Sequence, residues 1–189
     1  MLKKILLSTF FAITLNSNVF ANVAGLSNPQ LQQLKALGIS VVLPSYIPKG
    51  FEVDKVEAVI AKFSGMGTAP KTGDNHYKVT YSKKLKDGKT SEFSIETVAW
   101  GVGDVMQTNP IKVKTKIGEF LVYIDSNFVP NNKKLKNCID TEWVSYKNTF
   151  YRITSGSGCR LKDDVDDNSV QRVSNEDILK ILKSLQVIK

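Results

Sequence analysis

Apolar and polar residues alternate through the central part of the chain, which is the pattern of strands with one buried face. Residues 77–81 and 93–97 show this alternation most clearly. A three-residue loop ending at Gly88, with that glycine in the left-handed conformation, places Tyr81 opposite Phe93 and keeps one face of the hairpin apolar. A two-residue loop would mix the two faces, so we expect the three-residue loop.

A second hairpin is predicted over residues 111–124, where apolar residues alternate with lysines. If residues 117 and 118 form its tip, Val113 faces Val122 on the apolar side. The outer side then carries lysines beside larger side chains: Lys112, Lys114, Lys116, Leu121 and Tyr123.

Two helices are predicted at the ends of the domain. Ser27 or Asn28 caps a short N-terminal helix that has Pro29 in its first turn and Gly38 after its end. Ser174 caps an amphipathic C-terminal helix that is predicted to continue through Leu185 to Gln186. The apolar stripe of this second helix needs a partner, and the apolar face of the sheet is the large candidate.

The fold class follows from these elements. Residues 51–60 add a further strand, with a change of phase near Lys55 that predicts a β-bulge. We therefore expect an α+β fold: an antiparallel sheet of about six strands connected as meander hairpins, with a short N-terminal helix and the C-terminal amphipathic helix packed on one face.

The last predicted hairpin begins and ends at the two cysteines of the chain, Cys138 and Cys159. With Asn148 and Thr149 at its tip, the cysteines face each other in a non-hydrogen-bonded pair, the cross-strand position that suits a disulfide. A redox site would need a C-x-x-C spacing and a zinc site four ligands, whereas the chain has two cysteines and one histidine. We therefore predict a structural disulfide.

The N-terminus has the pattern of a secretory signal peptide. Lysines at positions 3 and 4 precede an apolar run to Leu15, and a small-x-small ending follows at Ala21. The run is too short to span a membrane, and no later segment is long enough. We expect residues 1–21 to be removed and residues 22–189 to form one periplasmic or secreted domain, in a compartment where disulfides form.

The charge of the chain suggests a partner. Its formal net charge is +8, and removal of Lys3 and Lys4 with the signal peptide lowers it to +6. Basic strips attract anionic envelope polymers or envelope proteins, and nucleic acid is not the favoured partner. Lysines on outer strands also serve solubility and edge protection, and this alternative stays open. The candidate binding residues are Lys112, Lys114, Lys116, Tyr123, Trp143 and Arg152, the last three for stacking.

One segment partly matches a metal site. Asp164, Asp166 and Asn168 occupy the first three ligand positions of a calcium loop. The match ends there, because Ser169 stands where the loop needs glycine and Asn175 where it needs a bidentate glutamate. We expect a solvated acidic loop, and we predict no metal or other cofactor.

No catalytic constellation emerges from the sequence. The segment 155–158 lacks the first glycine of G-x-S-x-G, and His76, the single histidine, lies at the start of a predicted strand. Carboxylates such as Asp140 and Glu142 could act as acid and base, but no pocket signature accompanies them. An envelope hydrolase with unidentified catalytic carboxylates is therefore the alternative to a binding domain.

A resemblance enters at residues 42–51, V-L-P-S-Y-I-P-K-G-F. The pattern L-P-x-Y-[IL]-P-x-G-[FY] leading into a strand resembles the opening of a group of bacterial extracytoplasmic domains of unknown function. The resemblance implies an α+β domain located in the cell envelope, and it provides no catalytic residues. Pro44 and Pro48 also have a structural reason to be there, because they hold the segment extended before Gly50 permits a turn.

Overall fold

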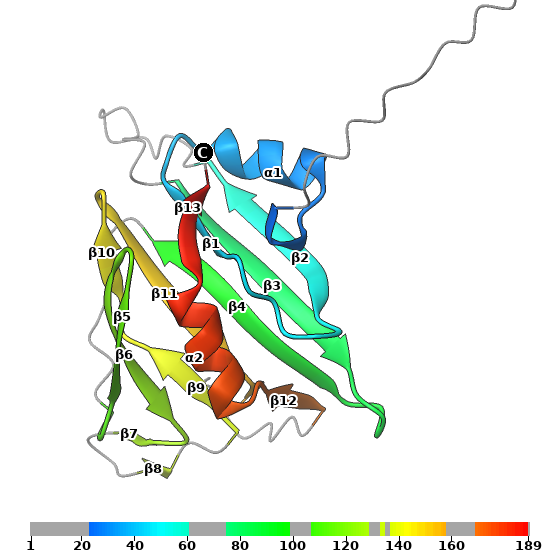
Figure 1. The fold of residues 1–189 in the computed structure, drawn as a ribbon, viewed down its shortest axis with the longest axis vertical. Coiled ribbons are helices and arrows are strands. Elements are labelled where there is room, and N and C mark those ends of the chain that lie inside the picture. The colour runs from blue at the N-terminus through cyan, green and yellow to red at the C-terminus, as the bar shows by residue number, and fades with distance from the viewer. Residues whose placement is uncertain are drawn as a thin grey trace, which may run out of the picture.

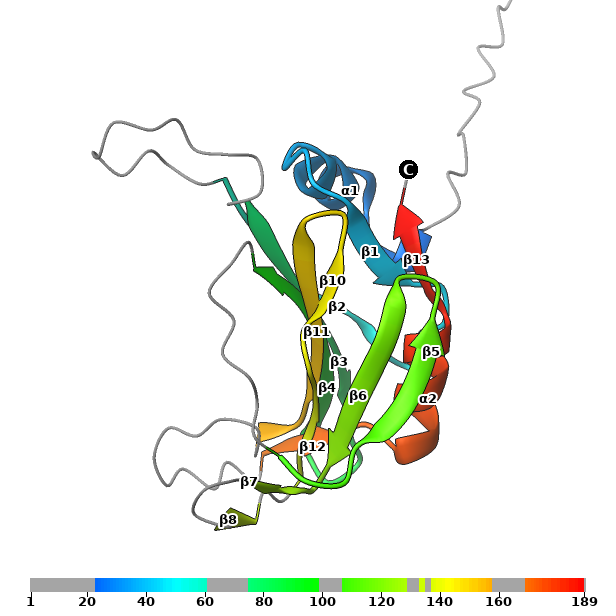
Figure 2. The same ribbon diagram turned by 90° about the vertical axis from the view of Figure 1, so that its left-hand side faces the viewer.

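The computed structural model describes residues 23–60, 75–98, 107–128, 133–134, 137–157 and 169–188. These residues form a curved central sheet with two α-helices and a small two-stranded sheet on one side of it (Figures 1 and 2). Neither of these helices is long and apolar enough to cross a membrane. The predicted signal peptide lies outside the described residues.

The central sheet has nine strands in the described part of the chain, and not about six. Seven of them lie in the order β2 (Glu52–Val59), β3 (His76–Lys84), β4 (Thr90–Val98), β11 (Thr149–Ser155), β9 (Ile139–Thr141), β6 (Gly118–Ile124) and β5 (Ile111–Thr115). The other two, β10 (Val144–Tyr146) and β12 (Val170–Arg172), pair with β11 and β4.

The α+β class and the mostly antiparallel sheet are confirmed, whereas the simple meander was wrong. Strand β11 lies between β4 and β9, and β12 runs parallel to β4. Strands β9, β10 and β12 are three residues long. The first two lie within the single strand predicted between Cys138 and the turn at Asn148, whereas β12 was not predicted, because three residues show too little alternation to be recognised.

Two further pairs of strands lie apart from the central sheet. Strand β1 (Val41–Pro44) pairs with β13 (Leu185–Ile188), and β7 (Asn127–Phe128) pairs with β8 (Lys133–Lys134). The C-terminal helix was predicted to run into the β13 residues, but α2 (Asn175–Lys183) ends earlier. The β-branched residues of β13 favour the extended conformation, and β1 offers them a partner strand.

Both predicted helix caps are confirmed. Ser27 precedes α1 (Asn28–Lys35), and its backbone N–H donates to Gln30 Oε1 at 2.9 Å. Ser174 precedes α2, and its Oγ accepts from the backbone N–H of Asp177 at 3.0 Å. These bonds satisfy donors that a helix start leaves without intrahelical partners. A short 3-10 helix, η1 (Val23–Gly25), comes before α1.

The β3–β4 hairpin has the predicted register. Tyr81 faces Phe93 and Val79 faces Ile95 across the pair. Gly88 closes the loop with a φ of +83°, the left-handed conformation that the three-residue loop requires. The bulge predicted in β2 is also present, as a shift of register between Val53 and Lys55.

The predicted register of the β10–β11 hairpin was wrong by two residues. Val144 faces Tyr151 and not Ile153. The turn is formed by Lys147 and Asn148, whose φ angles are +48° and +63°. A β-branched residue adopts positive φ only at high cost, so the threonine that follows stays in the strand instead of forming the turn.

The β5–β6 hairpin shows an error of the same size. Val113 faces Phe120 and not Val122, so the turn lies at Lys116 and Ile117. The apolar side chain of Ile117 is buried, whereas the prediction placed this residue at an exposed hairpin tip. A shift of two residues keeps each side chain on its face of the sheet, so the predicted inner and outer faces remain correct.

Buried tyrosines fix the N-terminal segment on the sheet. Tyr77 Oη donates to the carbonyl of Val42 and accepts from its N–H, both at 2.8 Å. Tyr81 Oη donates to the carbonyl of Ala24 at 3.1 Å. Each ring fills the core while its hydroxyl satisfies backbone groups of a separate layer. Together with α2, this layer covers the inner face and leaves the other face of the sheet without a described helix (Figure 2).

Candidate functional site

The sheet face turned away from α2 carries polar side chains from its central strands. We call this surface the open face and define it by outward residues of β3, β4, β11 and β9: Lys78, Thr80, Glu92, Ser94, Glu96, Arg152, Thr154 and Asp140. It arises from strand alternation, because the neighbouring residues in these strands point into the core. The cross-strand register aligns the open-face residues in rows.

An ion-pair chain crosses the open face. Lys78 Nζ lies 3.7 Å from Glu96 Oε2, and Arg152 Nε lies 3.8 Å from Glu96 Oε1. Arg152 also holds Asp140 with two hydrogen bonds, from Nε at 2.8 Å and from Nη2 at 3.1 Å. The pairing follows from register, because Lys78, Glu96 and Arg152 face one another on adjacent strands. Both cations of the open face are therefore neutralised within the protein.

Asp140 is the buried member of this chain, with 2% of its surface exposed. Burial raises the pKa of its carboxyl group, and the Arg152 guanidinium partly offsets that effect. Gln107 Nε2 donates a further hydrogen bond to Oδ2 at 3.2 Å. With these partners the carboxylate is a structural anion and is not free to receive a substrate proton.

The predicted stacking residues Trp143 and Arg152 lie together. The Arg152 guanidinium carbon is 5.4 Å from the centre of the half-buried Trp143 ring, a cation–π contact. The indole therefore packs against the end of the ion-pair chain. This contact and the Asp140 hydrogen bonds hold the arginine side chain in one position.

Tyr123 is placed differently from the prediction. Only 3% of its surface is exposed, and its hydroxyl donates to Glu142 Oε1. Burial, with the Glu142 carboxylate as the next cause, raises the pKa of Tyr123 well above its ordinary value. The ring is beneath the surface, so the expected stacking role for Tyr123 is not supported.

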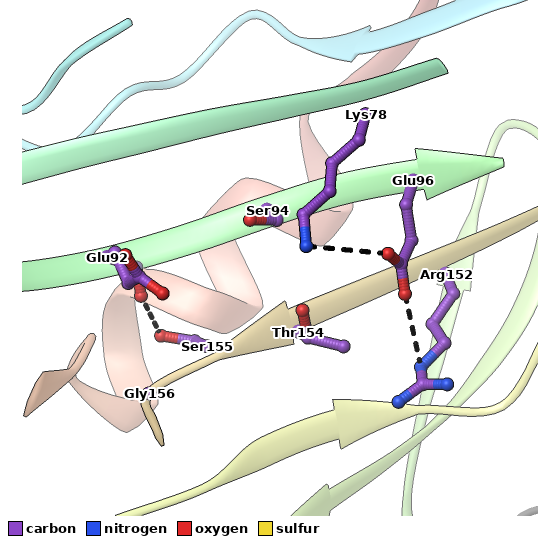
Figure 3. Close-up of a pocket in the computed structure, with 8 residues that line it drawn as sticks. All are labelled: Lys78, Glu92, Ser94, Glu96, Arg152, Thr154, Ser155 and Gly156. Atoms are coloured by element: carbon purple, nitrogen blue, oxygen red, sulfur yellow. Dashed lines mark hydrogen bonds and ion pairs between the residues drawn. The ribbon is translucent and has the colours of Figure 1, made fainter. Parts of the chain in front are cut away.

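A shallow depression of about 150 Å³ lies on the open face between β4 and β11 (Figure 3). Its polar floor is largely satisfied, because Ser94 Oγ is 3.0 Å from Thr80 Oγ1 and Ser155 Oγ donates to the carbonyl of Glu92. Among the described residues, the Glu92 carboxylate and the Thr154 hydroxyl have no hydrogen-bond or ion-pair partner. Sequence analysis missed this depression.

The predicted lysines form a separate surface, which we call the basic strip: Lys112, Lys114 and Lys116. All three are exposed, the first two on β5 and the third in the turn after it. Within the described part of the chain, none of them has a carboxylate within ion-pair distance. Strands β6 and β9 separate β5 from β11, which places the strip roughly 14 Å from Arg152 along the sheet. The six predicted binding residues therefore do not make one site.

The cysteine prediction is only partly within the described residues. Cys138 is buried just before β9, and Cys159 lies outside the described part, so the disulfide stays a prediction. The hairpin register behind it was wrong, because Ser155 faces Ile139. This brings Gly156 next to the Cys138 region, where its Cβ position would lie 2.0 Å from the Asn137 carbonyl oxygen.

A polar cluster that the sequence did not indicate joins β6, β9 and β12. The Asn137 side chain donates to the carbonyl of Val170 at 2.6 Å and accepts from the Arg172 N–H at 2.9 Å. Arg172 Nη2 pairs with Asp125 Oδ2 at 2.9 Å, and Asp125 Oδ1 accepts from the Cys138 N–H at 2.9 Å. These contacts join three chain segments and have a structural role. Isolated polar residues in loops gave no pattern that could predict them.

The calcium candidates Asp164, Asp166 and Asn168 lie outside the described residues. Within the described ranges, no three histidine, cysteine or acidic side chains gather as a metal site. No family model matches the chain, and neither a curated protein nor a solved structure is significantly similar to it. The resemblance at residues 42–51 stays a prediction.

Proposed function

We propose that this chain is an exported, non-enzymatic binding domain of the cell envelope, periplasmic or secreted, whose basic strip attracts an anionic polymer or an acidic surface of an envelope protein. The signal-like N-terminus and the cysteine pair support the export part of this proposal. The observation that carries the binding part is the contrast between the lysines of the strip and the two cations of the open face, Lys78 and Arg152.

The strip lysines keep their charge available. Lys78 and Arg152 are paired with carboxylates, whereas the ammonium groups of the strip are exposed and lack ion pairs among the described residues. Unpaired ammonium groups along one strand and its turn add their potentials and attract anions over a Debye length of about 10 Å. A polyanion that displaces counterions from such a strip binds with strong salt dependence.

The hydrolase alternative receives no specific support. Asp140 accepts two hydrogen bonds from Arg152, and Glu142 accepts one from Tyr123. A general acid or base needs a carboxyl group that can reach the reacting atom, and these two already hold protein partners. Their arrangement explains packing between β6, β9 and β11, so we retain the binding proposal alone.

The test compares two variants of equal charge. One carries glutamine at all three strip positions, Lys112, Lys114 and Lys116. The matched control carries glutamine at three exposed lysines scattered over α1, the β3–β4 loop and α2, namely Lys35, Lys86 and Lys183. Retention on immobilised dextran sulfate is measured as a function of salt for both proteins and for the wild type.

The strip variant should elute at lower salt and show a flatter salt dependence than the control, because fewer counterions are released. Circular dichroism checks that both variants keep the fold. If the two variants elute together, net charge alone explains retention and the strip has no special role. A wild-type protein that is not retained at low salt also contradicts the proposal.

A further inference from the structure

We propose that the depression on the open face is a binding site for one sugar ring of a neutral oligosaccharide. This site is distinct from the basic strip, and the inference goes beyond the proposed polyanion binding. It concerns the hollow between β4 and β11, which is lined by residues of these two strands and by Lys78 of β3 (Figure 3).

The free polar groups of the depression are of complementary kinds. Glu92 offers carboxylate oxygens as acceptors, and Thr154 offers a hydroxyl that donates and accepts, with no described partner for either. Lys78 has one long ion-pair contact of 3.7 Å, so its ammonium group retains donors. A sugar hydroxyl donates one hydrogen bond and accepts others, so it uses both kinds of group at once.

The depression carries charges of both signs. Two carboxylates, Glu92 and Glu96, and two cations, Lys78 and Arg152, line it, and Asp140 pairs with Arg152 beside it. A strongly anionic ligand would approach the unpaired Glu92, and a cationic ligand would approach Lys78. A neutral ligand with many hydroxyl groups avoids both repulsions and uses all the polar groups. The anionic polymer proposed for the basic strip is therefore not the ligand expected here.

The Arg152 end of the site is also held in place before any ligand arrives. Glu96 lies between Lys78 and Arg152, and Arg152 is fixed by Asp140 and by the Trp143 ring. Side chains ordered in advance lower the entropic cost of binding. The volume of about 150 Å³ is smaller than the roughly 300–1,000 Å³ of pockets for drug-sized ligands. It therefore suits one ring, with the rest of the chain extending over the open face.

The experiment uses maltotetraose, cellotetraose and chitotetraose as neutral probes. The chain has two tryptophans, so Trp100→Phe leaves Trp143 as the single indole reporter. Because the Arg152 guanidinium lies over that ring, a ligand that contacts Arg152 changes its fluorescence. At least one probe should give a saturable change that is insensitive to salt.

Variants then locate the binding. Thr154→Val removes a hydroxyl, and Glu92→Gln replaces a charged acceptor with a weaker neutral one. Each change should weaken binding of the responding probe about fivefold. Thr154→Ser keeps the hydroxyl and should bind as the parent does, which separates a binding defect from a folding defect. Glu119→Gln, on β6, and the triple basic-strip variant should leave the affinity unchanged.

Several results would overturn the inference. One is the absence of a saturable response to all three oligosaccharides in the folded protein. Equal losses in Glu92→Gln and Glu119→Gln would place the ligand elsewhere. Salt-sensitive binding of the diamine cadaverine, without oligosaccharide binding, would identify the depression as a cation site. Loss of glycan binding in the basic-strip variant would show that the two surfaces are one site.

Discussion

The open face and the basic strip use cations in opposite ways, although both lie on outer positions of one sheet. On the open face, the Arg152 side chain is 20% exposed and its partner Asp140 only 3%. In the strip, the lysines extend into solvent without described ion-pair partners. The difference lies in the neighbouring strands, because a cation between two strands that carry carboxylates is neutralised, whereas β5 has one neighbour in the sheet. Position in the sheet, more than residue type, separates structural from available charge.

The largest expected effect concerns how tightly the end of the open face is built. Gly156 has a φ of +87°, and an added Cβ would lie 2.0 Å from the Asn137 carbonyl oxygen. Gly88 has a similar φ of +83° but open space around it. Gly156→Ala should lower the free energy of unfolding by about 4 kcal/mol, because steric overlap adds to backbone strain. Gly88→Ala should cost only about 1–2 kcal/mol.

Urea unfolding of both variants measures this difference, with the unfolding slope checked for two-state behaviour. The two glycines share a backbone conformation, so the difference between their losses of unfolding free energy measures the steric overlap with the Asn137 carbonyl at the end of β11. Equal losses would mean that the strand end relaxes around the new methyl group.

The second effect tests the neutralised cations directly. Asp140→Ala leaves the Arg152 guanidinium without its buried partner, and removing one member of such a pair costs about 3 kcal/mol. Glu119→Ala is the control, because Glu119 is exposed on β6 and faces Lys114 of the strip. Its cost should be within about 0.5 kcal/mol, as is usual at exposed positions. Similar costs at the two positions would remove the distinction between the surfaces.

The sequence predicted those parts of the sheet in which local pattern and turn chemistry agree. The β3–β4 hairpin has long alternation and a glycine at the left-handed loop position, so a single register kept one face apolar. In β10–β11 and β5–β6 the alternation assigned the faces correctly but left the turn free to move by two residues. The position of the β10–β11 turn depended on the positive φ of Lys147, and that of the β5–β6 turn on the burial of Ile117. Both are properties of the folded structure.

The candidate site was less predictable, because its residues come from strands that are distant in sequence. The depression depends on the pairing of β4 with β11, which brings Glu92 and Thr154 to one hollow. A meander assumption does not produce that pairing. The sequence did place Trp143 and Arg152 together, since both belong to one local hairpin region. It also identified the basic strip, which needs only alternation along a single strand.

The pH dependence of Asp140 gives a smaller and more specific effect. Its pKa in the folded protein is raised by burial, so folded protein holds the proton more tightly than unfolded protein does. This tighter proton binding adds fully to the free energy of unfolding at pH values below the pKa of Asp140 in the unfolded chain. The added stability is lost as the pH rises through the pKa of Asp140 in the folded protein. Arg152→Gln should raise the pKa of Asp140 further, because the guanidinium is the main group that lowers it.

Carbon-13 NMR of the Asp140 carboxyl group measures this pKa in both proteins. Unfolding free energies of Asp140→Asn and the wild type, compared across the same pH range, test the sign. The advantage of the wild type over Asp140→Asn should shrink as the pH rises. A lower pKa of Asp140 in Arg152→Gln would show that Arg152 does not neutralise Asp140, and the open face would then not differ from the basic strip in this respect.

The smallest effect decides whether the strip lysines are truly unpaired. Lys114 faces Glu119 across β5 and β6, whereas Lys78 faces Glu96 across β3 and β4 at an ion-pair distance of 3.7 Å. Double-mutant cycles to alanine should give a coupling of about 0.8 kcal/mol for Lys78 with Glu96 and about 0.2 kcal/mol for Lys114 with Glu119, within the range of partly exposed pairs. The couplings are measured by urea unfolding at low salt and at about 0.5 M salt, which screens exposed charges. The higher salt should reduce the coupling of Lys78 with Glu96 and leave that of Lys114 with Glu119 near zero. A coupling for Lys114 with Glu119 as large as the other would show that the strip is neutralised by its neighbouring strand. The polyanion proposal would then lose the free charge on which it rests.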